Sequence, residues 1–168
     1  SQISIEDETY IQFIIRDISA RKKNEDELRY HVDRLELLAS ITTAMPGDEP
    51  LADKCEKIAG YVKDAFHLDA CVIRTLDEHL DLHLLASSGL PESDKIPVMS
   101  GRLGLGKLIL RDKKPIVIND VHSDSRLSNF TAMYKGGYGF ISYAGAPMIV
   151  GDKVIGIIGV YSSNKLIR

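Results

Sequence analysis

Two apolar segments near the C-terminus constrain the fold more than any other feature of this sequence. Residues 140–150 (FISYAGAPMIV) and 153–161 (KVIGIIGVY) are rich in the β-branched and aromatic residues that favour β-strands. Only Gly151 and Asp152 separate them, and a two-residue connection that starts with glycine is typical of a tight β-hairpin turn. The sequence therefore predicts two long antiparallel strands that lie side by side.

Upstream of this hairpin the apolar pattern changes from a helical period to a strand period. One helix is predicted over residues 51–66, where a wide apolar stripe contains Leu51, Cys55, Ile58, Val62, Ala65 and Phe66. Beyond residue 69 the pattern is that of strands, which we expect over residues 70–76, 80–88 and 115–120. Short helices are expected over residues 107–112 and 126–135. This order predicts an α+β fold, with a single mostly antiparallel sheet flanked by helices.

The N-terminal part of the chain has a different character. Residues 9–18 have the composition of a strand, and residues 19–36 are mostly charged, with neither glycine nor proline. A long N-terminal helix is therefore predicted over residues 19–46. Its apolar seam alternates steps of four and three, as in a coiled coil: Leu28, Val32, Leu35, Ala39 and Thr42. Two interpretations stay open, a helix that pairs with a second copy of itself and a solvated amphipathic helix.

The glycine-rich segment GRLGLGKL, residues 101–108, comes close to the phosphate-binding pattern G-x-x-x-x-G-K-[ST]. Leu108 stands where that pattern needs a hydroxyl group to hold Mg²⁺, and a phosphate-binding loop also follows a buried parallel strand. This sequence meets neither requirement, because Leu108 has no hydroxyl group and the predicted sheet is antiparallel. The glycines instead predict a tight turn into a helix that begins near Leu105. A weaker alternative is that the first amides of this helix hold an anionic ligand.

Composition excludes several classes of protein and partner. A length of 168 residues predicts one domain with a linker or tail, and a net charge of −3 does not indicate a nucleic-acid or membrane partner. The longest apolar run near the N-terminus, residues 13–15, is too short to cross a bilayer. Two cysteines are too few for a disulfide scaffold. A cytoplasmic location is expected.

The residue types that usually bind metals or attack substrates do not form a catalytic set. Cys55 lies in the helical stripe, and Cys71 shares a strand face with Ile73, so both are expected in the core. His79 and His83 fall in a turn and a strand, where four residues separate them by about 13 Å, too far to share a metal. We therefore expect no metal site and no catalytic residue.

These segments carry a resemblance to a known family. Residues 51–164 resemble a GAF domain, through DACVIRTLDEHLDLHLLASSGLP, GRLGLGKLILRDKKPIVINDV and GAPMIVGDKVIGIIGVYSS. The segment YIQFIIRDISARKKNEDELR resembles the last strand of a PAS domain with its exit motif, residues 16–19. The implied organisation is a PAS strand remnant over residues 1–18, a signalling helix over residues 19–46, and a GAF domain over residues 47–168 that lacks its usual C-terminal helix.

The resemblance implies a regulatory sensor module of a multidomain bacterial-type signalling protein rather than an enzyme. Such a module binds an unidentified small molecule and relays its state through a dimeric N-terminal helix to an output domain, a histidine kinase or a diguanylate cyclase. The expected partners are thus a second copy of the chain, the output domain of the same chain and a small molecule, without nucleic acid or membrane. The alternative is an unliganded relay and dimerisation module, with a pocket filled by Tyr138, Phe140 and Met148.

No cofactor is expected, because the motifs of the ligand-binding branches of the family are missing. Bilin-binding members need a cysteine near the pocket, and haem-binding members need a histidine before the hairpin, yet residues 123–143 contain neither. The cyclic-nucleotide signature is not found. The branch that reduces methionine sulfoxide needs a set of pocket cysteines, which two core cysteines do not supply.

The expected small-molecule pocket lies on the sheet face that the short helices cover. Its candidate ligand-binding residues are Arg74, Ser87, Leu105, Asp120, Asn129, Tyr134, Tyr138 and Phe140. Arg74 shares a face with apolar residues, and it either binds a ligand anion or lies at a sheet edge, paired with Asp77 or Asp120 or solvated. The strand glycines imply close approach by a backbone, a bulky side chain or a ligand: Gly145, Gly156 and Gly159.

Overall fold

The computed structural model describes residues 2–5, 8–11, 19–44, 47–92, 95–127 and 139–166. The chain divides into two compact units, Ser1–Leu35 and Glu36–Arg168, and each is described by itself.

The first unit contains a small antiparallel hairpin and the start of a helix. Strands β1 (Gln2–Ile5) and β2 (Glu8–Ile11) pair so that Ile3 lies opposite Tyr10. The strand expected over residues 9–18 is thus present in its first residues, and its partner β1 was not predicted. Residues 12–18 lie outside the described part of the chain.

Helix α1 (Ser19–Ala44) has 26 residues and occupies most of the segment in which the sequence predicted a helix. It follows from a run of strong helix formers that contains neither glycine nor proline. Several apolar side chains of α1 are exposed: Leu28, Val32, Leu35 and Leu38. The pairing of this helix with a second copy stays a prediction.

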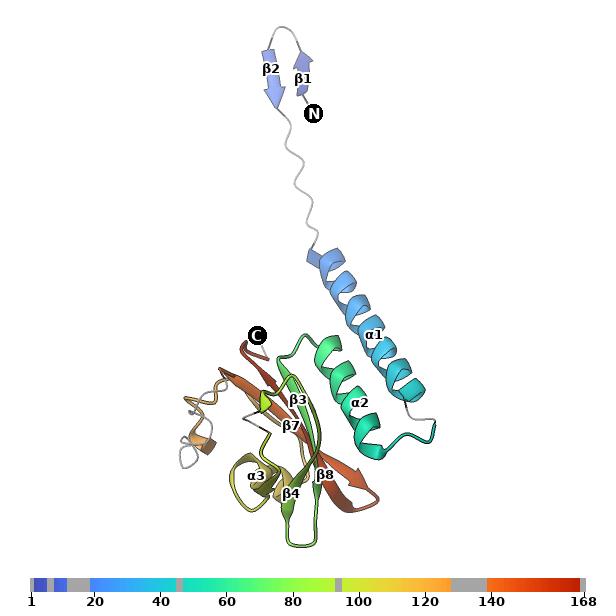
Figure 1. Ribbon diagram of the computed structural model, residues 1–168. Coiled ribbons are helices and arrows are strands. Elements are labelled where there is room, and N and C mark those ends of the chain that lie inside the picture. The colour runs from blue at the N-terminus through green and yellow to red at the C-terminus, as the bar shows by residue number, and fades with distance from the viewer. Residues whose placement is uncertain are drawn as a thin grey trace. The chain divides into compact units, whose positions relative to one another are not determined.

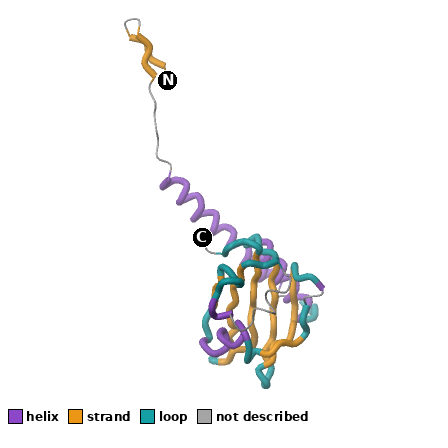
Figure 2. The backbone as a smooth tube through the Cα atoms, turned by 90° about the vertical axis from the view of Figure 1, so that its left-hand side faces the viewer, coloured by secondary structure: helices purple, strands orange, loops and turns teal. Residues whose placement is uncertain are grey.

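The second unit is built on a six-stranded sheet with the order β5-β4-β3-β8-β7-β6, in which all neighbouring strands are antiparallel. Figure 2 shows these strands edge to edge. The strands are β3 (Ala70–Leu76), β4 (Asp81–Ser88), β5 (Val98–Ser100), β6 (Ile116–Ile118), β7 (Ser142–Val150) and β8 (Lys153–Ser162). The antiparallel sheet and the closing hairpin predicted from the sequence are confirmed.

Helices α2 and α3 lie on opposite faces of this sheet (Figure 1), and each face carries its own hydrophobic cluster. Helix α2 (Leu51–Ala65) packs on β3 and β4, where its Ala59 belongs to the same buried cluster as Cys71, Ile73 and Ala86. Helix α3 (Gly104–Asp112) packs on the opposite face over β6, β7 and β8. The cluster on this α3 side contains Leu82, Leu105, Ile109, Ile118, Val121, Leu127, Tyr143 and Ile157.

The remaining differences from the sequence prediction are local. Strand β5 was not predicted, because its three residues follow Pro97 and offer little periodicity. Of the helix predicted over residues 126–135, the structure describes a 3₁₀ turn, η2 (Ser125–Leu127), while residues 128–138 lie outside the described part. Among the helices that are described, none is both long and apolar enough to cross a lipid bilayer.

Candidate functional site

The α3 side of the sheet is the candidate site, and the side chain of Tyr143 occupies its centre. Tyr143 is 5 % exposed, and its ring lies over the backbone of Gly145 and Gly159, which face each other on β7 and β8. A Cβ atom on Gly159 would lie 3.0 Å from Tyr143 Cε2, and one on Gly145 would collide with the Tyr143 hydroxyl. These two glycines therefore make room for a bulky side chain of the protein itself.

The third strand glycine has a different role. A Cβ atom on Gly156 would collide with the carbonyl oxygen of Arg74 and with the end of the Met148 side chain. Of the three explanations left open by the sequence, a bulky side chain thus accounts for Gly145 and Gly159, and a close backbone together with a side chain accounts for Gly156.

Aromatic rings extend this packing toward one end of the sheet. The ring centroids of Tyr143 and Tyr161 are 5.1 Å apart at an interplanar angle of 60°, and those of Phe140 and Tyr161 are 5.4 Å apart at 37°. Offset and tilted contacts of this kind are the favoured arrangement for aromatic pairs. Leu105 of α3 and Leu127 of η2 are fully buried in the same cluster.

Arg74 lies on this α3 side but its guanidinium is directed to the main chain. Arg74 pairs with Ile157 across β3 and β8, so the two side chains share a face. Its Nη1 donates to the carbonyl oxygen of Ile96 at 2.8 Å and to that of Leu82 at 3.4 Å, and the residue is 9 % exposed. Because β3 is the third of six strands, the alternative that placed Arg74 at a sheet edge was wrong.

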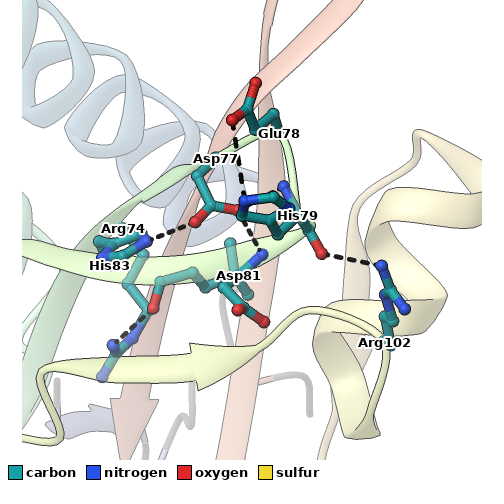
Figure 3. A network of polar contacts seen from close by, with 8 residues as sticks. Arg74, Asp77, Glu78, His79, Asp81, His83 and Arg102 are labelled. Atoms are coloured by element: carbon teal, nitrogen blue, oxygen red, sulfur yellow. Dashed lines mark hydrogen bonds and ion pairs between the residues drawn. The ribbon is translucent and has the colours of Figure 1, made fainter.

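A polar network fixes the turn between β3 and β4 (Figure 3). Asp77 Oδ1 accepts hydrogen bonds from the backbone N–H groups of His79 at 2.9 Å and Asp81 at 2.8 Å, while Oδ2 lies 2.8 Å from His83 Nε2. The hydrogen bond with His83, followed by that from the Asp81 backbone, lowers the pKa of Asp77 below its usual value. His83 is thus a partner of Asp77, and no described group of His, Cys, Asp and Glu side chains is arranged to hold a metal ion.

The glycine-rich segment packs against this turn. The backbone N–H of Gly101 donates to the carbonyl of Leu80 at 2.8 Å, and Arg102 Nη2 donates to the carbonyl of His79 at 3.1 Å. A Cβ atom on Gly101 would lie 2.5 Å from the Leu80 oxygen. The glycine therefore permits a close backbone approach, and α3 begins at Gly104, next to the predicted start at Leu105.

Four of the predicted ligand-binding residues share the α3 side of the sheet. Besides Arg74 and Leu105 these are Ser87, 8 % exposed and paired with Val72, and Phe140, half-buried against Tyr161. Asp120 instead closes the turn after β6: its Oδ1 accepts the His122 N–H at 2.9 Å, which lowers its pKa. Asn129, Tyr134 and Tyr138 lie outside the described residues.

The two cysteines lie in the other layer of the protein, as predicted. Cys71 is fully buried in the cluster between α2 and the sheet, and Cys55 packs against the same cluster. Burial raises the pKa of the Cys71 thiol to about 12 and also raises the pKa of the Cys55 thiol. Neither thiol is activated as a nucleophile.

Sequence reasoning missed Tyr143 and Tyr161, the residues that fill the centre of the site. The signal was present as two spaced pairs, Tyr143 with Gly145 and Gly159 with Tyr161. They become meaningful once the register places Tyr143 opposite Tyr161 and Gly145 opposite Gly159.

Comparisons with known proteins agree with this architecture. No curated protein matches the sequence. The GAF domain of a phosphoenolpyruvate-protein phosphotransferase from Acinetobacter is 20% identical, with a TM-score of 0.62 over 82% of this chain and 78% of that one. The free methionine-R-sulfoxide reductase of Neisseria meningitidis, in complex with its substrate, is 16% identical, with a TM-score of 0.65 over 95% and 83%.

A domain assigned to a two-component sensor histidine kinase of Sinorhizobium meliloti is 17% identical, with a TM-score of 0.56 over 70% of this chain and 76% of that one. At these identities the likeness concerns the fold. The sequence itself matches the GAF domain family over residues 50–166. Together with the antiparallel sheet, the helices on its two faces and the glycine-rich entry to α3, this match shows that the chain belongs to the GAF domain family.

Proposed function

We propose that the chain is a regulatory GAF module of a multidomain signalling protein, and that it relays signals with a pocket filled by its own side chains. The observation that carries this proposal is the buried ring of Tyr143 over the backbone of Gly145 and Gly159. A ligand on this part of the sheet would have to displace that ring. Arg74, a buried charged residue on the same face, supports the proposal because it donates to backbone carbonyls.

The filling differs in detail from the one expected from the sequence. Phe140 contributes through its contact with Tyr161, whereas Met148 packs in the cluster between α2 and the sheet and fills the other layer. Tyr138, the third expected residue, lies outside the described part of the chain.

The relay is proposed to run through pairing of α1 with a second copy. Leu28, Val32 and Leu35 are 65 %, 44 % and 66 % exposed, and their spacing is that of a coiled-coil seam. Burial of these exposed apolar side chains against a second helix would stabilise the paired state. The output domain that receives the signal is proposed to be a histidine kinase or a diguanylate cyclase in the same protein, and residues 1–18 the end of a PAS domain.

Sedimentation velocity tests the pairing. We expect a dimer at micromolar concentration. The double substitution V32E/L35E should dissociate it, because each of the two paired helices then places two negative charges in the apolar seam. Lys23→Glu, at an exposed position of α1 outside the seam, is the matched control and leaves the dimer intact. A wild-type monomer at high micromolar concentration would contradict the pairing.

A ligand-binding sensor is the second candidate, and Phe140 and Tyr161 favour it because both side chains are only half-buried at the border of the filled centre. Native mass spectrometry of the purified protein, followed by denaturation and identification of any released small molecule, separates the two candidates. A metabolite bound in stoichiometric amount would replace the relay proposal with the sensor.

We further propose that this chain is not an enzyme, although a reductase of free methionine sulfoxide shares its fold. The support is the position of its two cysteines, both in the layer between α2 and the sheet and both with raised thiol pKa values. Incubation with free methionine-R-sulfoxide and dithiothreitol should leave the sulfoxide unchanged. Turnover that disappears in Cys71→Ser would overturn this assignment.

A further inference from the structure

A cleft separate from the aromatic centre opens where α3 turns into strand β6. Its volume is about 560 Å³, within the range of small-molecule sites. The lining residues are Leu108, Arg111, Asp112, Lys114, Pro115, Ile116 and Arg126. None of them is among the residues that the sequence indicated for the GAF pocket, and all belong to the second unit.

The base of the cleft is apolar and its position is fixed. Leu108 and Ile116 are half-buried and pack against the hydrophobic cluster on the α3 side. The turn between them is tight, because Lys113 adopts a left-handed conformation with φ of 49° and Pro115 follows. Lys113 Nζ also donates to the carbonyl of Asp152 at 2.7 Å, which holds the turn against the β7–β8 hairpin. The apolar base and the turn beside it are therefore held in place by the fold.

The rim of the cleft carries an excess of positive charge. Three lining residues are cationic (Arg111, Lys114 and Arg126), and one is anionic (Asp112), so the lining carries a net charge of +2. The pair of Arg111 with Asp112 is already included in this sum. Arg126 pairs with Asp124, which lies outside the lining, and this carboxylate reduces the excess to +1. Lys114 is exposed, and among the described residues it makes no salt bridge within 4.0 Å, although it lies close enough to Asp112 to add to the lowering of that carboxyl's pKa by Arg111. The carbonyl end of α3 offsets about half a charge at most.

Arg126 also makes the cleft unsuited to a peptide that adds a strand to the sheet. Strand β6 is the last in the sheet order, and its Val117 carbonyl accepts a hydrogen bond from Arg126 Nη2 at 3.0 Å. An added strand would need that carbonyl. The occupant favoured by the structure is thus a small molecule.

We propose that this cleft binds a small amphipathic anion, with an apolar ring or chain on Leu108 and Ile116 and a carboxylate or phosphate group beside Lys114. Tyr143 does not line the cleft, so an anion can occupy it while the ring of Tyr143 stays in place, although Leu108 and Ile116 pack against the cluster that contains this ring. Charge-assisted hydrogen bonds to the anion supply orientation, and the apolar base supplies contact area.

The test compares three probes of one shape that differ in charge: 2-naphthoate, 2-naphthamide and 2-naphthylmethylamine. Binding to the full chain is measured by isothermal titration calorimetry and mapped by changes in backbone amide NMR signals. We expect 2-naphthoate to bind about tenfold more tightly than 2-naphthamide, with signal changes at residues 108–117 and 126. Its affinity should fall as salt is raised.

Variants at exposed positions complete the test. Lys114→Glu should weaken 2-naphthoate binding about tenfold, whereas Lys165→Glu, an exposed lysine outside the lining, is the matched charge control and leaves it unchanged. Circular dichroism confirms that both variants are folded. Equal affinity for the three probes, no effect of Lys114→Glu, or signal changes centred on residues 140–145 and 159–161 would each overturn the proposal.

Discussion

The packing of Tyr143 over two strand glycines leads to a quantitative prediction for a double-mutant cycle. Tyr143→Leu keeps an apolar side chain in the cluster but lacks Cε, Cζ and Oη, the atoms that approach Gly145 and Gly159. Gly159→Ala introduces a Cβ atom whose three nearest neighbours, at 3.0, 3.1 and 3.4 Å, all belong to Tyr143. The two substitutions therefore test one contact from its two sides.

The expected magnitudes follow from the geometry. Tyr143→Leu removes part of a ring that is 5 % exposed, and large-to-small changes of this size in a core cost about 1–3 kcal/mol of unfolding free energy. Gly159→Ala alone should cost about 1 kcal/mol, because the buried ring must shift by a few tenths of an ångström. In the Tyr143→Leu background the Cβ atom meets open space, and alanine should be neutral or stabilise the strand by about 0.5 kcal/mol. The expected coupling is thus about 1–1.5 kcal/mol.

Urea denaturation of the wild type, both single variants and the double variant, followed by circular dichroism, measures the four free energies. Gly151→Ala is a poor control because Gly151 has a φ of 58°, whereas Ala86→Gly on β4, two strands away and on the α2 side of the sheet, is a suitable one. Ala86→Gly should be additive with Gly159→Ala. A coupling below about 0.3 kcal/mol between Tyr143→Leu and Gly159→Ala would refute the inference that the ring fills the sheet surface.

Three further predictions concern the β3–β4 turn and the buried thiol. Asp77→Asn should destabilise the protein at pH 7, and the difference from wild type should vanish as the pH falls below about 4. The reason is that a carboxyl whose pKa is lowered on folding stabilises the fold at pH values above its pKa in the unfolded chain, and this contribution is lost as the folded carboxylate is protonated. A difference in stability that does not depend on pH would show that the charge interaction with His83 is irrelevant. Leu80→Gly should raise the free energy of unfolding by about 1 kcal/mol, because Leu80 is 43 % exposed and its φ of 63° disfavours any side chain. A lower free energy of unfolding in urea denaturation would contradict this. Cys71, with a thiol pKa of about 12, should resist Ellman's reagent at pH 8 until the protein is unfolded, and Cys55 should react first; simultaneous reaction of both thiols in the native protein would be inconsistent with the burial of Cys71.

The periodicity of the sequence was sufficient for the long elements of the fold. The boundaries of β3 were predicted to the residue, and β4 and β8 within one residue, because alternation along a half-buried strand is a local signal. Strand β5 was missed because its three residues gain their structure from pairing with β4, a contact that no local pattern reports. The partner strand β1 was missed for a similar reason, since its four residues look like any short polar–apolar run.

The centre of the site could not be predicted because it depends on a β-bulge. Near the hairpin turn Val150 pairs with Lys153 and Ile149 with Val154, and this register, if continued, would place Tyr143 opposite Val160. The register shifts between Met148 and Ile149, and beyond the shift Tyr143 lies opposite Tyr161. A shift of one residue moves each side chain of a strand to the other face relative to its partner strand. One unpaired residue therefore decides whether the two tyrosines and two glycines meet.

Arg74 shows why charged candidates on an apolar strand face are hard to assign from sequence. Its carbonyl partner at Ile96 is 22 residues away, in the connection between β4 and β5. This backbone carbonyl needs a hydrogen-bond donor because it is part of a partly buried main-chain segment, whatever side chain the residue carries. A carbonyl leaves no trace in the amino-acid sequence, so an arginine that satisfies one looks the same as an arginine that awaits an anionic ligand. If the guanidinium were instead a ligand group, Arg74→Met would leave the fold intact and remove binding. Because it bridges β3 to the chain before β5, we expect Arg74→Met to loosen the β5 edge, with faster amide exchange at Leu84, whose N–H donates to Pro97 in the same connection.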